Sequence, residues 1–470
     1  MSNYDFIASA SLADIPHITV VDAPCGAGKT TWAIDEMDRN PHQRYIFCTP
    51  FLKELDRIKG DSKVHCFAQP LNFEKSKLEH FEELLAQKRD IVVTHSTFQN
   101  ATPRTMELIR AGNYILILDE ALDTVADFNR LPAVEERRVP GIDTGDVRIL
   151  LNGNQLRVGE KGKAEWIGGD CGKSNFDEAI RLARLGNLYV VREAAFACVL
   201  SPEIFRLFSQ VYVLTYLFDG TTLKSYFDLM ELPYRVVGIR REGEDLSLVE
   251  HSPAQDLEFR RAARELITFY DSKKLTYGHT ELSKTWYKRN NTKKSKEFAE
   301  MRGSLRYFFR KNAKASAALD EIMWTCPSEY EDKIKGKGYT SVAPITAADK
   351  ENKTPQELKE LERRLSCFVP CNAKATNDFG NRWALAYCCN VFYPPMLKGL
   401  FADNGVAFDE ERFALSCIVQ WVWRSRIRNG EPIHLYILSA RMREIFQAWL
   451  FEEENDSVLA APSITPQPPS

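Results

Sequence analysis

A glycine-containing segment near the start of the chain has the residue types that bind phosphate. Residues 23–30 read APCGAGKT and follow a run of β-forming residues. They match the phosphate-binding pattern G-x-x-x-x-G-K-[ST], except that alanine replaces the first glycine. In this pattern backbone N–H groups surround phosphate oxygens, Lys29 reaches the outer phosphates and Thr30 ligates Mg²⁺. The helix expected next would direct its positive end at the anion. The predicted nucleotide-binding residues of this segment are Pro24, Gly26, Ala27, Gly28, Lys29, Thr30 and Thr31.

An acidic partner on a neighbouring strand would distinguish such a site from a strand, turn and helix that bind nothing. Residues 114–121 read YILILDEA, so a buried aliphatic strand is expected to end in Asp119 and Glu120. Asp119 would hold Mg²⁺ through water, and Glu120 would polarise the attacking water as a catalytic residue. The two segments together predict a site for ATP and Mg²⁺, with Thr30 and Asp119 as the metal-binding residues.

The elements expected to position these residues alternate between short apolar runs and longer mixed stretches. From about residue 17 to 235 the runs are ITVVDA, YIFCTP, DIVVTH, YILILDEA and VYVLTY. Buried strands separated by helices are typical of a parallel sheet in an α/β fold. Residues 129–170 interrupt the pattern with Pro and Gly turns and an expected hairpin at ILLNGNQLRVG. We therefore expect a nucleotide-binding domain over residues 1–235 with a small β-rich insertion at about 129–170.

A second domain is expected over residues 236–450. Its strand candidates are YRVVGI, EIMWTC, LSCFVP, WALAYCCNVF and HLYILS. A basic helical insertion is expected at 272–345. Residues 451–470 are rich in Pro and Ser towards their end, which predicts a disordered tail.

Composition sets limits on the kind of protein. The chain has 470 residues, of which 44% are hydrophobic and 27% charged, values that are ordinary for a globular protein. The net charge of -3 neither requires nor excludes a nucleic-acid partner. The 11 cysteines form no CxxC pair, which favours buried or free thiols in a reducing compartment over a metal site. No apolar run is long enough for a membrane span, so we expect a cytoplasmic protein, in the host cytoplasm if it is viral.

Several segments in chain order resemble the superfamily 2 helicases, the DEAD/DEAH-like group of two-domain motors. They are 23-APCGAGKT-30, 49-TPFLKELDRI-58, 92-VVTHSTF-98, 119-DEAL-122, 214-LTYLF-218, 372-NAKATNDFGNR-382 and 420-QWVWRSRIR-428. The last departs from the family pattern Q-x-x-G-R-x-G-R, because Trp423 replaces a glycine and Ile427 replaces the second arginine. The resemblance implies two RecA-like P-loop domains, catalytic roles for Gln420, Arg424 and Arg428, and a nucleic-acid contact at Thr376. The combination of 215-TYLFDGTT-222 and 420-QWVWRSRIRNG-430 also resembles helicase-like proteins of phages and other mobile elements.

Two groups of residues are candidates for nucleic-acid contact. The hydroxyl residues Thr49, Thr94, Ser96 and Thr97 are expected at strand ends, where they would bind phosphate oxygens or act as ordinary helix caps. Between residues 272 and 314 lie 13 Lys or Arg and three Glu, interleaved with aromatic residues. Charges of this kind bind a backbone while rings stack on bases. The alternative is a solvated helix pair with a few buried rings. The predicted contacts in this segment are Trp286, Lys293 and Lys294.

The predicted function is a nucleic-acid-dependent ATPase that translocates along or unwinds its partner. We expect a role in phage or mobile-element DNA replication or repair, with DNA preferred to RNA, and replication proteins as further partners. An ATP-switched clamp or replication-initiation factor that binds without processive unwinding is the alternative. The sequence leaves the oligomeric state open.

Overall fold

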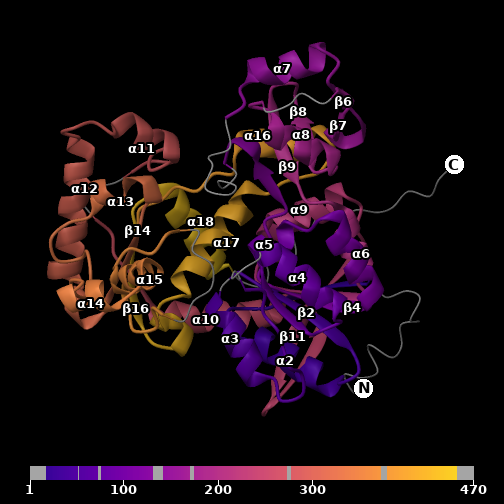
Figure 1. Cartoon of the computed structure of the whole chain (residues 1–470). Helices are drawn as coiled ribbons and strands as arrows, with labels where there is room; N and C mark the ends of the chain where they lie inside the picture. The colour runs from indigo at the N-terminus through magenta and orange to yellow at the C-terminus, as the bar shows by residue number, and fades with distance from the viewer. Residues whose placement is uncertain are drawn as a thin grey trace. The chain divides into compact units, whose positions relative to one another are not determined.

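The computed structural model describes residues 17–50, 52–71, 76–130, 141–169, 174–272, 277–371 and 378–452. It divides the chain into two compact units (Figure 1). The first contains the residues up to 251, together with the segment Tyr393–Phe413. The second contains Ser252–Phe392 and the residues from Ala414, with which the short loop Pro24–Gly26 is also grouped.

The first unit is built on a seven-stranded sheet, counted over the described residues, with the order β12-β11-β1-β10-β4-β2-β3. The strands are β1 (Ile18–Asp22), β2 (Arg44–Thr49), β3 (Ile91–Thr94), β4 (Tyr114–Asp119), β10 (Gln210–Thr215), β11 (Tyr234–Glu242) and β12 (Asp245–Glu250). All neighbours are parallel except the β11–β12 pair. The five runs expected as strands of the first domain are therefore strands. The assignment of YRVVGI to the second domain is wrong, because this run forms β11 and pairs with β1.

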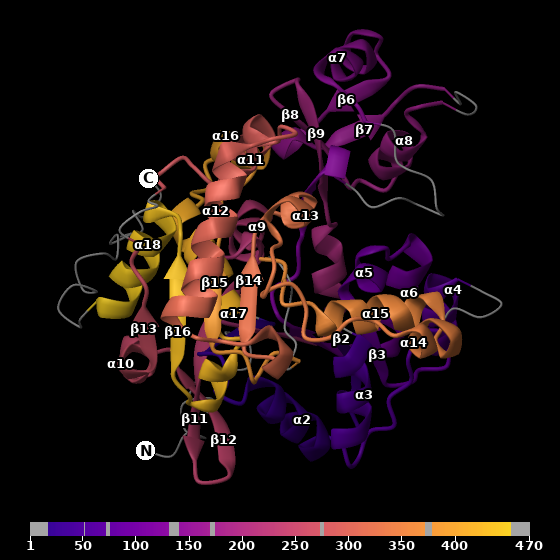
Figure 2. The same cartoon turned by 90° about the vertical axis from the view of Figure 1, so that its left-hand side faces the viewer.

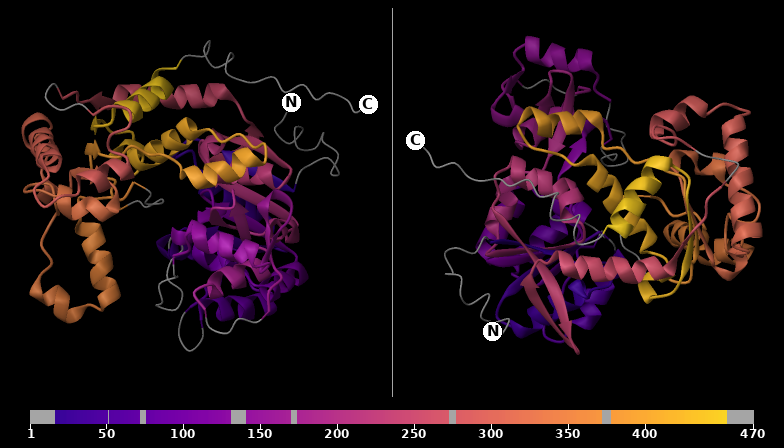
Figure 3. Two further views of the ribbon diagram at one scale, coloured as in Figure 1. Left: turned by 90° about the horizontal axis from the view of Figure 1, so that it is seen from above. Right: turned by 180° about the vertical axis from the view of Figure 1, so that it is seen from behind.

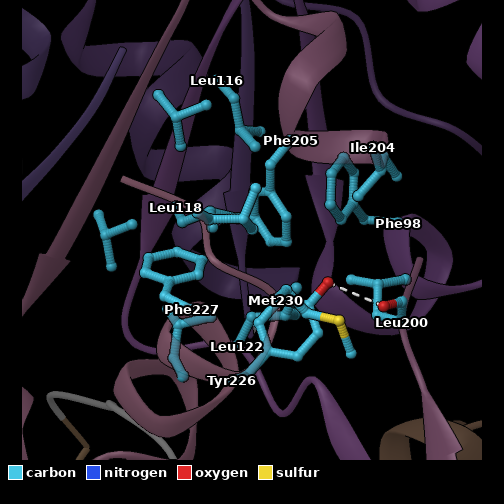
Figure 4. Packing of buried hydrophobic residues seen from close by; sticks show 14 of the residues in the cluster. Phe98, Leu116, Leu118, Leu122, Leu200, Ile204, Phe205, Tyr226, Phe227 and Met230 are labelled. Carbon is cyan, nitrogen blue, oxygen red and sulfur yellow. Dashed lines mark hydrogen bonds between the residues drawn. The ribbon is translucent and has the colours of Figure 1, made fainter. Parts of the chain in front are cut away.

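Helices cover both faces of this sheet. They are α2 (Lys29–Arg39), α3 (Leu52–Asp61), α4 (Lys77–Ala86), α5 (His95–Gln99), α6 (Pro103–Gly112) and α9 (Thr222–Leu229). Helix α16 (Pro395–Asp403) also belongs to the first unit and contacts strands β5 (Val125–Asp127) and β8 (Leu188–Val191) of the insertion. Side chains alternate along a strand, so Leu116 and Leu118 of β4 belong to one hydrophobic core and Ile117 to the other. Figure 4 shows part of the first core, where the Tyr226 hydroxyl donates to the Leu200 carbonyl at 2.8 Å.

The insertion in the first unit combines helices with short strands. It includes β5 (Val125–Asp127), α7 (Thr144–Asn152), β6 (Leu156–Val158), β7 (Ala164–Trp166), α8 (Asp177–Arg184), β8 (Leu188–Val191) and β9 (Ala195–Val199). The expected hairpin at ILLNGNQLRVG is displaced, because its first residues lie in α7 and the hairpin is β6–β7. A capping box between Asp143 and Asp146 begins this helix, and Val147 and Leu150 are buried with helical spacing.

The second unit is built on a sheet that has four strands among the described residues, with the order β13-β16-β15-β14 and parallel pairing throughout. The strands are β13 (Ile267–Phe269), β14 (Ile322–Thr325), β15 (Ala384–Tyr387) and β16 (Ile433–Ile437), and Figure 2 shows them side by side. The run LSCFVP is not a strand of this sheet. Its described bridges are isolated ones, from Phe368 to Trp324 and from Ser366 to Ser341. The predicted α/β class, with a parallel sheet in each of two units, is confirmed.

The remaining helices are α10 (Pro253–Leu266), α11 (Lys284–Asn290), α12 (Lys296–Tyr307), α13 (Glu331–Ile334), α14 (Ala347–Asn352), α15 (Pro355–Leu365), α17 (Glu410–Val422) and α18 (Ala440–Phe451). Helix α10 packs against α18 (Figure 3), and Arg260 donates from Nη1 to the Trp449 carbonyl at 2.8 Å. None of the helices in the described part of the chain combines the length and the apolar character needed to cross a membrane.

Candidate nucleotide-binding site

The phosphate loop connects β1 to α2, and two glycines give it its shape. Gly26 has φ +86° and Gly28, the N-cap of α2, has φ +92°, a left-handed region that side chains rarely adopt. A Cβ on Gly26 would have no atom within 4 Å, so the backbone conformation rather than crowding favours glycine at this position. Ala23, which replaces the first glycine of the pattern, is not among the residues with positive φ. Its N–H donates to the Thr215 carbonyl at 3.1 Å, so alanine causes no backbone strain here.

Lys29 is folded back over the loop rather than extended away from it. Its Nζ donates to the Ala23 carbonyl at 2.6 Å. The ammonium group therefore lies against the start of the loop, and its contact with the outer phosphates stays a prediction.

The carboxylate of Asp119 meets the hydroxyl of Thr30 although 89 residues separate them. Thr30 Oγ1 donates to Asp119 Oδ1 at 3.3 Å, and Thr49 Oγ1 lies 3.5 Å from Oδ2. Asp119 is only 8% exposed. Burial, followed by the charges of Glu120 and Glu54, raises its pKa to about 7, although Lys29 and the Thr30 hydrogen bond act in the other direction. Burial makes the charged form of Asp119 unfavourable, and a bound cation would offset this cost. The carboxylate and the neighbouring hydroxyl therefore fit a site for a divalent cation with oxygen ligands.

Glu120 is the first residue after strand β4, and its backbone is strained. Its φ is +66°, uncommon for a residue other than glycine, and its N–H donates to the Leu214 carbonyl at 2.9 Å. Residues held in such conformations concentrate at functional sites. His95 stabilises the same turn, since its Nε2 donates to the Asp119 carbonyl at 3.0 Å.

The hydroxyl residues predicted to bind nucleic acid have mostly structural contacts. Thr49 is fully buried and faces Asp119, so the prediction for Thr49 is wrong. Thr94 is the N-cap of α5, because its Oγ1 accepts the Thr97 N–H at 3.4 Å, and Thr97 is buried. Thr94 therefore follows the helix-cap alternative, whereas Thr97 is a buried residue inside α5. Ser96 is exposed and stays a prediction.

The basic segment also differs from expectation. Trp286 is 5% exposed and packs edge-on against Tyr277 and Tyr287, with ring centroids 5.5 and 5.1 Å away. The prediction that Trp286 stacks on a base is therefore wrong, because the ring belongs to the core of the second unit. Lys293 and Lys294 are exposed and stay predictions. Thr376 lies outside the described residues.

The helicase-like arginines do not lie on one continuous helix. Helix α17 ends at Val422, just before Trp423. Arg424 follows the helix and is 5% exposed, whereas Arg428 lies in the short 3₁₀ helix Arg426–Asn429 and is exposed. Gln420 is half-buried in the last turn of α17. The catalytic roles expected for these three residues stay predictions.

Two acidic residues near the loop were not predicted from the sequence. Glu54 of α3 is close enough to raise the pKa of Asp119. Asp22 ends β1, and its Oδ2 accepts the Phe218 N–H at 3.0 Å. Within the described ranges no group hydrogen-bonds to its Oδ1, and burial raises its pKa. The sequence contained a signal for Asp22, because this carboxylate directly follows the apolar residues of a buried strand and could have been predicted to face the site.

Comparison with known proteins relates the chain to a bacterial prophage protein. The family model of the YonV C-terminal Rossmann-like domain matches residues 261–450. The "SPbeta prophage-derived uncharacterized protein YonV" of Bacillus subtilis (strain 168) is 30% identical over 448 residues, which cover 92% of this chain and 98% of that protein.

Solved structures resemble the chain over most of its length but weakly. S. tokodaii Xpd4 is 12% identical, with a TM-score of 0.44 and coverage of 97% of this chain and 98% of that one. A structure named XPD_Helicase is 12% identical, with a TM-score of 0.47 and coverage of 95% of both chains. Similarity at this level indicates neither a shared activity nor a shared ligand. The sequence match over almost the whole length of both proteins carries the assignment, and the chain belongs to the YonV family.

Proposed function

We propose that this protein is a Mg²⁺-dependent ATPase of the superfamily 2 helicase type, which couples ATP hydrolysis to translocation along nucleic acid or to its unwinding. The observation that carries the proposal is the contact of Thr30 with Asp119 at 3.3 Å beside a loop that already holds Lys29. This contact supports the proposal, because a phosphate-binding loop acts together with a metal-binding acid on a neighbouring strand.

Each residue of the site has a distinct role in the proposed reaction. The N–H groups of the loop and Lys29 bind the phosphates, while Thr30 and Asp119 hold the metal. Mg²⁺, when bound, supplies positive charge at the β- and γ-phosphates. Glu120 orients a water molecule and accepts its proton.

Nucleic acid binding is proposed for the basic surface of α11 and α12 in the second unit. The exposed cations of these helices and of the residues between and directly after them, up to Asn312, are Lys284, Lys288, Arg289, Lys293, Lys294, Lys296, Arg306, Arg310 and Lys311. Because Trp286 and Tyr287 are buried and Tyr307 is 58% exposed, cations rather than a row of rings dominate this surface. Contacts of cations with phosphates do not depend on the base sequence of the nucleic acid, and they weaken as the salt concentration rises.

The prophage origin of the Bacillus subtilis relative supports a role in phage or mobile-element DNA metabolism. We propose DNA as the partner, with replication or repair as the process and replication proteins as further partners. RNA is the competing nucleic acid in the test below.

The test measures ATP hydrolysis and strand separation with the same purified full-length chain. We expect slow hydrolysis alone, stimulation by single-stranded DNA, and ATP-dependent separation of forked DNA duplexes in preference to RNA duplexes. Lys29→Ala should abolish hydrolysis without unfolding the protein, since the side chain is only partly buried and alanine is a good helix former at the first residue of α2. Hydrolysis by this variant at the wild-type rate would refute the nucleotide site. Stimulation without strand separation would favour the ATP-switched clamp.

A further inference from the structure

The hairpin β11–β12 extends past the end of β1 at the edge where the phosphate loop begins. The last residue of β1 that pairs with β11 is Val21, opposite Val237. Strand β11 continues to Glu242, supported by β12, in which Leu246 pairs with Arg241 (Figure 2). The end of the hairpin therefore lies beyond the carboxyl end of β1, beside the start of α2.

Arg241 and Leu246 lie directly against Gly28 of the loop. A Cβ on Gly28 would stand 2.9 Å from Nη2 of Arg241 and 3.0 Å from Cδ1 of Leu246. Leu246 is 2% exposed and belongs to the core beneath α2, whereas Arg241 is exposed. Leu246 therefore anchors the hairpin to the protein, while the guanidinium group of Arg241 remains accessible at the loop.

The two charged neighbours of Arg241 on β11 pair with each other instead of facing the loop. Arg240 and Glu242 point to the other side of β11, as alternation along a strand requires, and Arg240 Nη1 lies 3.8 Å from Glu242 Oε1. Within the described part of the chain, the guanidinium group of Arg241 makes no hydrogen bond or ion pair, although the Arg241 backbone pairs with Leu246 in the hairpin. An arginine without an acidic partner at the edge of a phosphate loop has its donors available for an anion.

We propose that Arg241 is a further nucleotide-binding residue, which contacts the α- and β-phosphates from the β11–β12 hairpin. The proposal rests on the nucleotide site proposed above. Backbone N–H groups of a phosphate loop surround these two phosphates, and Gly28 belongs to that loop. The planar guanidinium group can donate two parallel hydrogen bonds to phosphate oxygens, which a lysine cannot.

The experiment measures binding of ADP and of inorganic pyrophosphate by competition against a fluorescent ADP analogue in the presence of Mg²⁺. Arg241→Gln should weaken binding of both competitors by about tenfold, because the charge-assisted hydrogen bonds of the guanidinium group to phosphate are removed. Arg241→Lys should weaken binding less, since it keeps the charge. The matched control is Arg240→Gln, one residue away on the other side of the strand, which should bind as the wild type does.

Three results would overturn the inference. Wild-type affinity of Arg241→Gln for ADP would exclude an interaction of this arginine with the phosphates. Weaker binding of ADP but not of pyrophosphate would place the interaction on the nucleoside instead. Failure of the wild-type protein to bind ADP at all would refute the proposed nucleotide site itself. The other two results would refute only the role of Arg241, because they require a wild-type protein that binds ADP. The thermal midpoint without nucleotide should be the same for all variants, because both arginines are exposed.

Discussion

Replacement of Asp119 by asparagine should stabilise the nucleotide-free protein while abolishing its response to Mg²⁺. The carboxylate is buried beside Glu120 and Glu54, and burial together with these charges raises its pKa from an ordinary value of 3.8 to about 7. Asparagine is nearly isosteric, and its Oδ1 can still accept the Thr30 hydrogen bond. The substitution therefore removes an unfavourable charge and leaves the packing in place.

The direction of the pH dependence follows from the raised pKa. Between the unfolded pKa near 4 and the folded pKa near 7, the folded protein binds more protons at Asp119 than the unfolded chain does. The penalty that Asp119 imposes on wild-type stability is therefore absent below its unfolded pKa and grows as pH rises towards 7. Three pKa units at about 1.36 kcal/mol each give a ceiling of roughly 4 kcal/mol at pH 8. Relaxation around the charge should reduce this to about 1–3 kcal/mol, a few degrees in thermal midpoint.

The measurement is thermal unfolding of both proteins from pH 5 to pH 8 with a metal chelator present, repeated with Mg²⁺ and ADP. The variant should gain in midpoint over the wild type as pH rises, and only the wild type should be stabilised further by Mg²⁺. A variant less stable than the wild type at pH 8, or a difference that does not change with pH, would refute the reasoning about Asp119.

Three further changes test other parts of the structure. Glu120→Gln should keep ATP bound and stop turnover, because an amide cannot accept the proton of water; loss of ATP binding in a filter assay would contradict this role. Changing Lys293, Lys294 and Lys296 together to Gln should leave basal hydrolysis intact and make the slope of log K against log salt for single strands shallower by roughly 0.7 for each phosphate that is no longer neutralised; an unchanged slope would exclude this surface. Trp286→Ala should cost about 3–5 kcal/mol of unfolding free energy, measured by denaturant titration, whereas a merely weakened affinity for DNA in a fully stable variant would restore the stacking hypothesis.

Local patterns predicted the first sheet well because parallel strands buried on both faces are nearly continuous apolar runs. The run YILILDEA became β4, and its two carboxylates lie where the sequence placed them. The same signal failed where tertiary context decides. YRVVGI has the correct strand character but pairs with β1 of the first sheet, and strand partners cannot be obtained from composition.

Aromatic residues among charges gave the other clear error. In the segment around α11, cations and aromatic rings alternate in sequence. This pattern fits a surface that binds single-stranded nucleic acid, and it fits a helix with a buried aromatic face equally well. Helical spacing places Trp286 and Tyr287 inside and leaves Lys288 and Arg289 exposed. Only the three-dimensional packing of Trp286 against Tyr277 and Phe298 decides between the two interpretations.

The end of strand β10, where the segment LTYLF begins, holds two parts of the candidate site through its main chain. It lies between β1 and β4, so it separates the strand of the phosphate loop from the strand of the acidic pair. The Thr215 carbonyl accepts the Ala23 N–H at 3.1 Å, and the Leu214 carbonyl accepts the Glu120 N–H at 2.9 Å. One strand end thus fixes the start of the loop and the strained turn at Glu120 together. Both contacts are made by main-chain carbonyls, which every residue type supplies. The geometry at this point therefore constrains the path of the backbone far more than the identity of the side chains, and divergence in this segment does not count against a nucleotide site.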